Sequence, residues 1–125
     1  MNPGFEPGAL LAQSYPLARG PRVRLRLAQS SDAEEIVALF ALNGLEPDRL
    51  EVAKLLRSNP RERIVICATA LIGSAETIVG VGAIQVGSSE PDILLADTML
   101  TSGLPELLTS ALRGRADAIA KRLAA

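Results

Sequence analysis

A small loop between an apolar run and a helical pattern, in residues 97–112 (DTMLTSGLPELLTSAL), is the first place where this sequence could do chemistry. Asp97 stands near the end of the apolar run, and a carboxylate at a strand end can act as a general base if burial raises its pKa. Ser102, Gly103 and Leu104 precede the helical pattern, where free backbone amides can bind a phosphate. The alternatives, which we favour, are a solvated carboxylate and an ordinary turn.

Two residues after the loop weaken the case for a phosphate. Pro105 has no backbone N–H, so it removes one donor. Glu106 places a negative charge in the first helical turn, where it suits the helix dipole but repels an anion. We therefore expect Gly103 to be a loop residue and Pro105 a helix-start residue.

Few other side chains offer chemistry. The sequence contains no His, so neither zinc binding nor triad hydrolysis is expected, and we predict no metal site. Cys67 lies inside an apolar run, where an inert buried thiol is the expected state. Arg22, Arg24 and Arg26 alternate with apolar residues; they could bind an anion, but a solvated strand face is the commoner arrangement.

Composition narrows the possible partners. A chain of 125 residues suits one domain, and its 13 basic and 14 acidic residues leave a net charge of −1. Aromatic residues make up only 2%, so nucleic acid is not an expected partner. The sequence has neither an apolar run of about 18 residues nor an export signal, so we expect no membrane partner and a cytoplasmic location.

The elements that must position these residues follow from hydropathy patterns. Residues 1–20 are rich in proline and glycine and predict a flexible arm, followed by a single domain over 21–125. The alternating RVRLRL at 22–27 predicts a strand. A capping box from Ser31 to Glu34 predicts the start of a helix, and Pro47 is expected at the start of a second one.

The second half of the chain reads as three strands and a helix. Apolar runs at 64–72, 77–86 and 93–100, separated by turn residues, predict a three-strand meander. Gly80 and Gly82 fall on one strand face, where we expect a helix to pack closely. A helical stripe runs from Leu104 to the end of the chain, with Gly114 as a possible kink.

This order of elements, with VRLRLAQSSDAEEIVALF at its front, resembles the N-terminal half of the GNAT superfamily of acyl-CoA-dependent acetyltransferases. The first helix of that family commonly starts with a D-A-x-x-I pattern, which residues 32–36 match. The resemblance covers about residues 22–112 and implies an α+β, partial GNAT-like fold. Its expected order is β-α-α-β-β-β-α, with a mainly antiparallel four-stranded sheet packed against helices.

The resemblance also implies a cofactor loop. In the family the fourth strand leads into R/Q-x-x-G-x-G/A, which binds the CoA pyrophosphate, and an acidic residue at the strand end can accept a proton. Here Gly103 matches the first glycine, whereas Leu100 and Pro105 depart from the pattern. The implied contacts are Ser102, Gly103 and Leu104 for the cofactor and Asp97 for catalysis. Because of the departures, we expect a degenerate site and no bound cofactor.

The family continues with further strands, for which the residues after 112 offer no counterpart. We therefore expect the edge of the fourth strand to be covered by a second copy, another partner or the N-terminal arm, with a homodimer as the simplest case. Our leading hypothesis is a truncated, non-catalytic GNAT-like domain that acts as a dimerisation or regulatory module. The alternative is an acyl-CoA-dependent N-acetyltransferase, or acyl-CoA sensor, whose site is completed across a dimer and holds acetyl-CoA. A segment of a longer enzyme is a third possibility.

Overall fold

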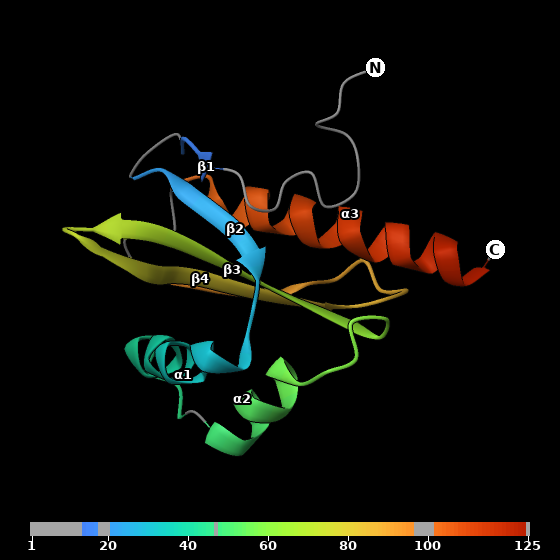
Figure 1. Cartoon of the computed structure of the whole chain (residues 1–125), viewed down its shortest axis with the longest axis horizontal. Coiled ribbons are helices and arrows are strands. Elements are labelled where there is room, and N and C mark those ends of the chain that lie inside the picture. Colours follow the sequence, from blue (N-terminus) through green and yellow to red (C-terminus); the bar gives the residue numbers. More distant parts are fainter. Residues whose placement is uncertain (1–13, 18–20, 47, 97–101, 125) are drawn as a thin grey trace.

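An antiparallel sheet lies between two helical layers in the computed structural model, which describes residues 14–17, 21–46, 48–96 and 102–124 (Figure 1). The elements are β1 (Ser14–Tyr15), β2 (Val23–Leu27), the short 3₁₀ helix η2 (Ser30–Asp32), α1 (Ala33–Leu42), α2 (Arg49–Leu56), β3 (Arg63–Ile72), β4 (Ala75–Gln85), β5 (Asp92–Leu95) and α3 (Leu104–Ala124). The strands are ordered β1-β2-β3-β4-β5. The predicted α+β fold, with β2 to β5 as its antiparallel sheet, is confirmed.

The strands form where the sequence is apolar and β-branched. Side chains from Ile64 to Ala70 in β3 are all buried, because helices cover both faces of the sheet. In β2 only one face is covered, so Val23 and Leu25 are buried while Arg24 points to solvent. The loop between β3 and β4 is tighter than the gap between the predicted runs 64–72 and 77–86. It is a two-residue turn in which Gly73 adopts φ 64°.

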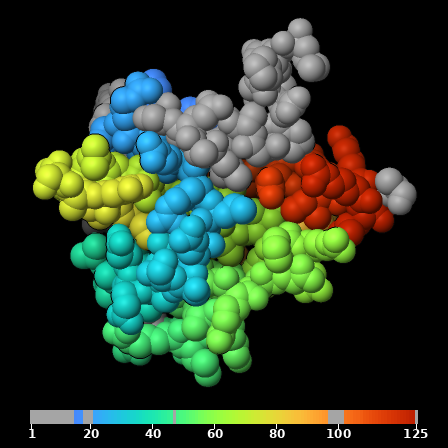
Figure 2. Space-filling model, in the orientation of Figure 1, coloured from blue at the N-terminus to red at the C-terminus, as the bar shows by residue number. Residues whose placement is uncertain are grey.

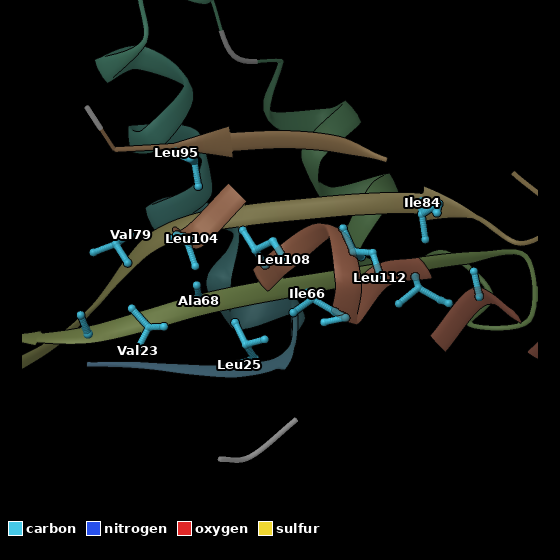
Figure 3. Close-up of a cluster of buried hydrophobic side chains, with 14 residues drawn as sticks. Val23, Leu25, Ile66, Ala68, Val79, Ile84, Leu95, Leu104, Leu108 and Leu112 are labelled. Carbon is cyan, nitrogen blue, oxygen red and sulfur yellow. The ribbon is translucent and has the colours of Figure 1, made fainter. Parts of the chain in front are cut away.

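Each face of the sheet has its own apolar cluster. Leu104, Leu108 and Leu112 of α3 pack against β2, β3 and β4 on one face (Figure 3). Ile36 and Leu39 of α1, together with α2, pack on the other face. The space-filling view shows α3 in red on one side of the sheet and α1 and α2 in cyan and green on the other (Figure 2). The sheet is thus the middle layer of three.

Two glycines of β4 allow α3 to lie close to the sheet. A Cβ added at Gly82 would sit 2.6 Å from Leu112 Cδ1, and one added at Gly80 would sit 2.7 Å from Leu95 Cδ2 and 3.2 Å from Leu104 Cδ2. The prediction that these glycines serve close helix packing is confirmed. α3 continues through Gly114 without a break.

Both predicted helix starts are wrong in detail. No Ser31–Glu34 capping box forms, because residues 30–32 make the 3₁₀ helix and α1 begins at Ala33. The second helix begins at Arg49, since the Asp48 carboxylate accepts from the amides of Leu50 (2.9 Å) and Glu51 (3.3 Å). Pro47 lies outside the described residues.

Part of the predicted arm belongs to the sheet. Ser14 pairs with Arg24 and Tyr15 with Val23, so β1 lies along the outer edge of β2. Tyr15 and Leu17 are partly buried against the α3-side cluster. The division into an arm over 1–20 and a domain over 21–125 stays a prediction. Within the described ranges, no helix has the length and apolar character needed to cross a membrane.

The glycine contacts predict opposite effects of two alanine substitutions. Gly82→Ala should lower the free energy of unfolding by about 1–3 kcal/mol, because Leu112 is fully buried and has little room to move. Gly114→Ala should raise it by about 1 kcal/mol, because nothing lies within 4 Å of the added Cβ and alanine favours a helix. Urea denaturation measures both. Equal effects of the two substitutions would contradict the close packing of α3.

Candidate functional site

The predicted cofactor residues lie at the start of α3. Ser102 and Leu104 are 1% and 0% exposed, and Gly103 adopts φ 93° between them. The Leu104 amide donates to Ser102 Oγ over 3.2 Å. The amide of Leu107 donates to the Gly103 carbonyl oxygen over 3.2 Å, which makes the first turn of the helix. Asp97, the predicted catalytic residue, lies outside the described residues.

This arrangement leaves the Leu104 and Pro105 positions without a free backbone donor for an anion. The Leu104 amide is already satisfied by a hydroxyl of the same chain, and the Leu104 side chain is part of the core. Pro105 has no N–H, and Glu106 lies in the first turn of α3. The described part of the loop therefore has the local hydrogen bonding of a capped helix start.

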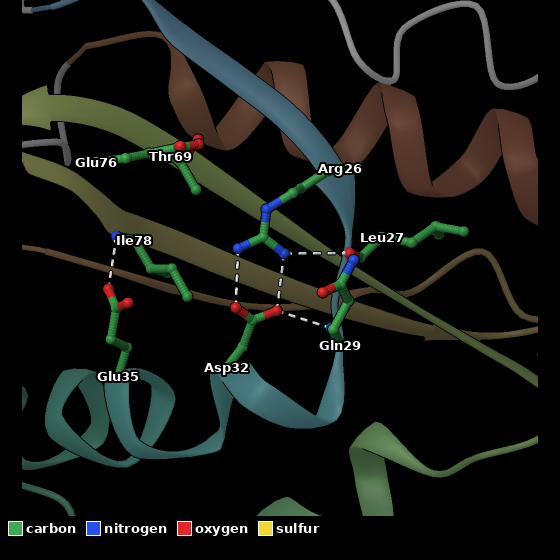
Figure 4. A network of polar contacts seen from close by, with 8 residues as sticks. All are labelled: Arg26, Leu27, Gln29, Asp32, Glu35, Thr69, Glu76 and Ile78. Atoms are coloured by element: carbon green, nitrogen blue, oxygen red, sulfur yellow. Dashed lines mark hydrogen bonds and ion pairs between the residues drawn. The ribbon is translucent and has the colours of Figure 1, made fainter.

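A buried bidentate ion pair lies elsewhere, between β2 and the start of α1 (Figure 4). Arg26 Nη1 and Nη2 donate to the two carboxylate oxygens of Asp32 over 2.7 and 2.8 Å. The Gln29 amide donates to the same carboxylate over 2.7 Å. Asp32 is only 6% exposed, so this bidentate pair replaces much of its hydration. The hydrogen bond from Arg26 lowers the pKa of Asp32, although burial opposes that shift.

Sequence reasoning had assigned these two residues to other roles. Arg26 was expected on a solvated face and Asp32 in a capping pattern. The signal that could have found the pair is weak, because an ion pair six residues apart forms only once the chain turns between strand and helix. Asp32 joins β2 to α1 as a paired carboxylate, and its lowered pKa keeps it ionised at neutral pH.

Three further polar groups of this region are engaged within the fold (Figure 4). Glu35 Oε2 accepts from the Ile78 amide over 3.1 Å, which ties α1 to β4. Thr69 Oγ1 donates to Glu76 Oε1 over 2.7 Å. Glu76 falls between the predicted strand runs 64–72 and 77–86, among the residues expected to turn, but it lies in β4 because the turn before it is short.

Cys67 is fully buried, as predicted. Burial is the main cause that raises the pKa of its thiol to about 12. The thiolate, which is the nucleophilic form, is therefore not populated near neutral pH. No group of three or more Cys, Asp or Glu side chains among the described residues could hold a metal ion.

The outer edge of β5 is the remaining feature of interest. The Ala96 amide donates to the Val79 carbonyl oxygen, so in the antiparallel ladder the backbone groups of Ile93 and Leu95 face away from β4. Asn43 Nδ2 donates to the Leu95 carbonyl oxygen over 3.1 Å, and to Leu39 of its own helix. Leu42, beside Asn43, is 72% exposed. Within the described residues, the exposed end of α1 thus lies next to a strand edge with which no other strand pairs.

Comparison with known proteins identifies the fold. No protein-family model matches the chain, and no curated protein matches it either. The GNAT domain of PAT from S. lividans is similar at TM-score 0.59 and 17% identity, over 93% of this chain and 76% of that one. A GNAT-family acetyltransferase from Streptococcus pneumoniae follows with TM-score 0.57, 20% identity and coverage of 78% and 68%. A ribosomal-protein-alanine N-acetyltransferase from Brucella melitensis is similar at TM-score 0.54 and 18% identity, over 77% of this chain and 72% of that one. The chain has a GNAT-like fold.

The Arg26–Asp32 pair predicts a pH-dependent contribution to stability. Because the folded pKa of Asp32 is depressed, its stabilisation is present above the unfolded pKa of about 3.9 and is lost as the pH falls through the folded value. Asp32→Asn should lower the free energy of unfolding by about 2 kcal/mol at neutral pH. This difference from the unmodified protein should shrink below about pH 4.

Urea titrations across that pH range measure the difference. Glu34→Gln is the matched control, because the Glu34–Arg49 pair is exposed and should contribute little. A difference at Asp32 that stays constant from neutral to acid pH would refute an ionised, paired carboxylate.

Proposed function

We propose that this GNAT-like domain acts by association, as a dimerisation or regulatory module, rather than as a catalyst. The observation that carries the proposal is the outer edge of β5, where Ile93 and Leu95 direct backbone groups away from the sheet. Soluble proteins rarely leave such an edge bare, because it can pair with any extended segment. The opposite edge of the sheet carries β1.

The candidate reactive groups support a non-catalytic role. The Leu104 amide is bound to Ser102, the Asp32 carboxylate is bound to Arg26, and the Cys67 thiol is protonated. Each of these groups serves the fold, so none is poised for proton transfer, nucleophilic attack or phosphate binding.

A second copy of the chain is the partner that suits the β5 edge best. If two β5 strands pair antiparallel about Leu94, Ile93 faces Leu95 of the other copy and Asp92 faces Ala96. This register brings no like charges together, and the Leu95 oxygen keeps a second lone pair beside its bond to Asn43. The exposed Leu42 adds apolar area next to the strand.

The competing function is acyl-CoA-dependent N-acetyl transfer or acyl-CoA sensing, with a site completed by the second copy. Its support is the shared fold and the left-handed Gly103, which would let a phosphate approach the backbone. A fold hosts many functions, so this support is weaker than that from the site itself.

Acetyl-CoA should not stabilise the protein. A ligand present at 100 times its dissociation constant would add about 2.7 kcal/mol to the free energy of unfolding and raise Tm by several degrees. We expect an unchanged Tm in a thermal melt with about 1 mM acetyl-CoA. A rise in Tm that the variant Gly103→Glu abolishes would establish the competing function instead.

If two copies pair through the β5 edge, the dimer should depend on the outward backbone N–H of Ile93. Ile93→Pro removes the outward amide donor, so the variant should sediment as a monomer. Ile93→Val keeps the donor and should sediment as a dimer, like the unmodified protein. Analytical ultracentrifugation gives the masses, and circular dichroism checks that both variants are folded. If the unmodified protein is a monomer at high micromolar concentration, the proposed association is wrong.

A further inference from the structure

The arginine-bearing face of β2 contains a groove that the proposed association does not use. Arg24 lines it from β2 and Arg22 from the residue before that strand, with Thr69 and Leu71 from β3 and Glu76 from β4, around a volume of about 400 Å³. Among the described residues, α1 packs mainly on β4 and β5 rather than on β2 or β3. The groove lies beside the Arg26–Asp32 pair, on the same face of β2.

The charges of the groove are separated across its width. Arg24 pairs in register with Thr69, and Glu76 pairs with Leu71 on the far side of β3. Arg26 is neutralised by Asp32, whereas Arg24 forms no ion pair with any residue that the structure describes. Glu76 keeps one carboxylate oxygen beyond its bond to Thr69. A cationic wall thus faces an anionic wall, with a hydroxyl between them.

The fourth feature of the groove is apolar. The Leu71 side chain, which lines the groove, is 68% exposed. An exposed aliphatic side chain at the wall of a groove gains buried apolar area when an aliphatic ligand binds beside it. A ligand that fits the groove therefore has an anionic group, a cationic group and an aliphatic body.

We infer that this groove binds a free aliphatic α-amino acid. The guanidinium of Arg24 suits the carboxylate, because arginine binds a planar anion through two donors. Glu76 suits the ammonium group, and Leu71 covers the side chain. A simple anion would meet repulsion from Glu76, and a simple amine would meet repulsion from Arg24, so the zwitterion is the ligand that both walls favour.

L-leucine is the probe that tests this inference, in amide NMR spectra of the full chain. Signals of residues 22–24 and 69–76 should shift and saturate with a dissociation constant of about 1 mM, as a ligand of so few atoms allows. Arg24→Gln and Glu76→Gln should each weaken binding about tenfold or more. Arg49→Gln, which removes an exposed arginine outside the groove, should leave the affinity unchanged.

Two further probes separate the zwitterion from its parts. Hexanoate lacks the ammonium group and L-leucinamide lacks the carboxylate, so each should bind at least about tenfold more weakly than L-leucine. Equal affinity for hexanoate would overturn the role of Glu76. Shifts that do not saturate, or an unchanged affinity in Arg24→Gln, would overturn the site. Neither result depends on whether β5 pairs with a second copy.

Discussion

The close approach of α3 to β4 is the constraint on which the rest of the structure depends. Because Gly80 and Gly82 have no side chains, nothing separates α3 from β4 at these positions. Leu104, Leu108 and Leu112 therefore pack directly onto the sheet. Burial of these leucines fixes the start of α3, and with it the Ser102–Gly103 turn. It also holds Leu95 of β5 in the same apolar cluster, so the loop and the strand edge are positioned by one packing contact.

The polar groups near the sheet divide into those that serve the fold and those that face outward. Arg26 and Asp32 join β2 to α1, and the Ser102 hydroxyl satisfies the amide of Leu104. The backbone of Ile93 and the guanidinium of Arg24 instead point to solvent. In the part of the chain that the structure describes, this GNAT-like fold thus has outward-facing backbone groups at the edge of β5 and a charged groove beside β2.

Much of the fold was predictable because the patterns behind it are local. Alternation gave β2, apolar runs gave β3 to β5, and the spacing of Gly80 and Gly82 indicated close helix packing. The Arg26–Asp32 pair and the pairing of β1 with β2 were missed, because each depends on how the chain turns between segments. The Asp48 cap is a local signal, and it was missed because Pro47 was taken as the start of the helix. Ser102, Gly103 and Leu104 lie at the helix start as expected, but a role in cofactor binding stays a prediction, as does any role of Asp97.

The central claim is that the β5 edge is covered by a second copy in solution. Hydrogen exchange at the amide of Ile93 tests this claim directly. That amide faces away from β4, so it should exchange slowly only when a partner strand accepts its hydrogen bond. The Leu94 amide faces β4 and serves as the reference in the same protein. The account predicts that hydrogen exchange at Ile93 slows as the protein concentration rises from about 10 to about 500 µM, while Leu94 is unchanged. Fast exchange at Ile93 at every concentration would contradict it.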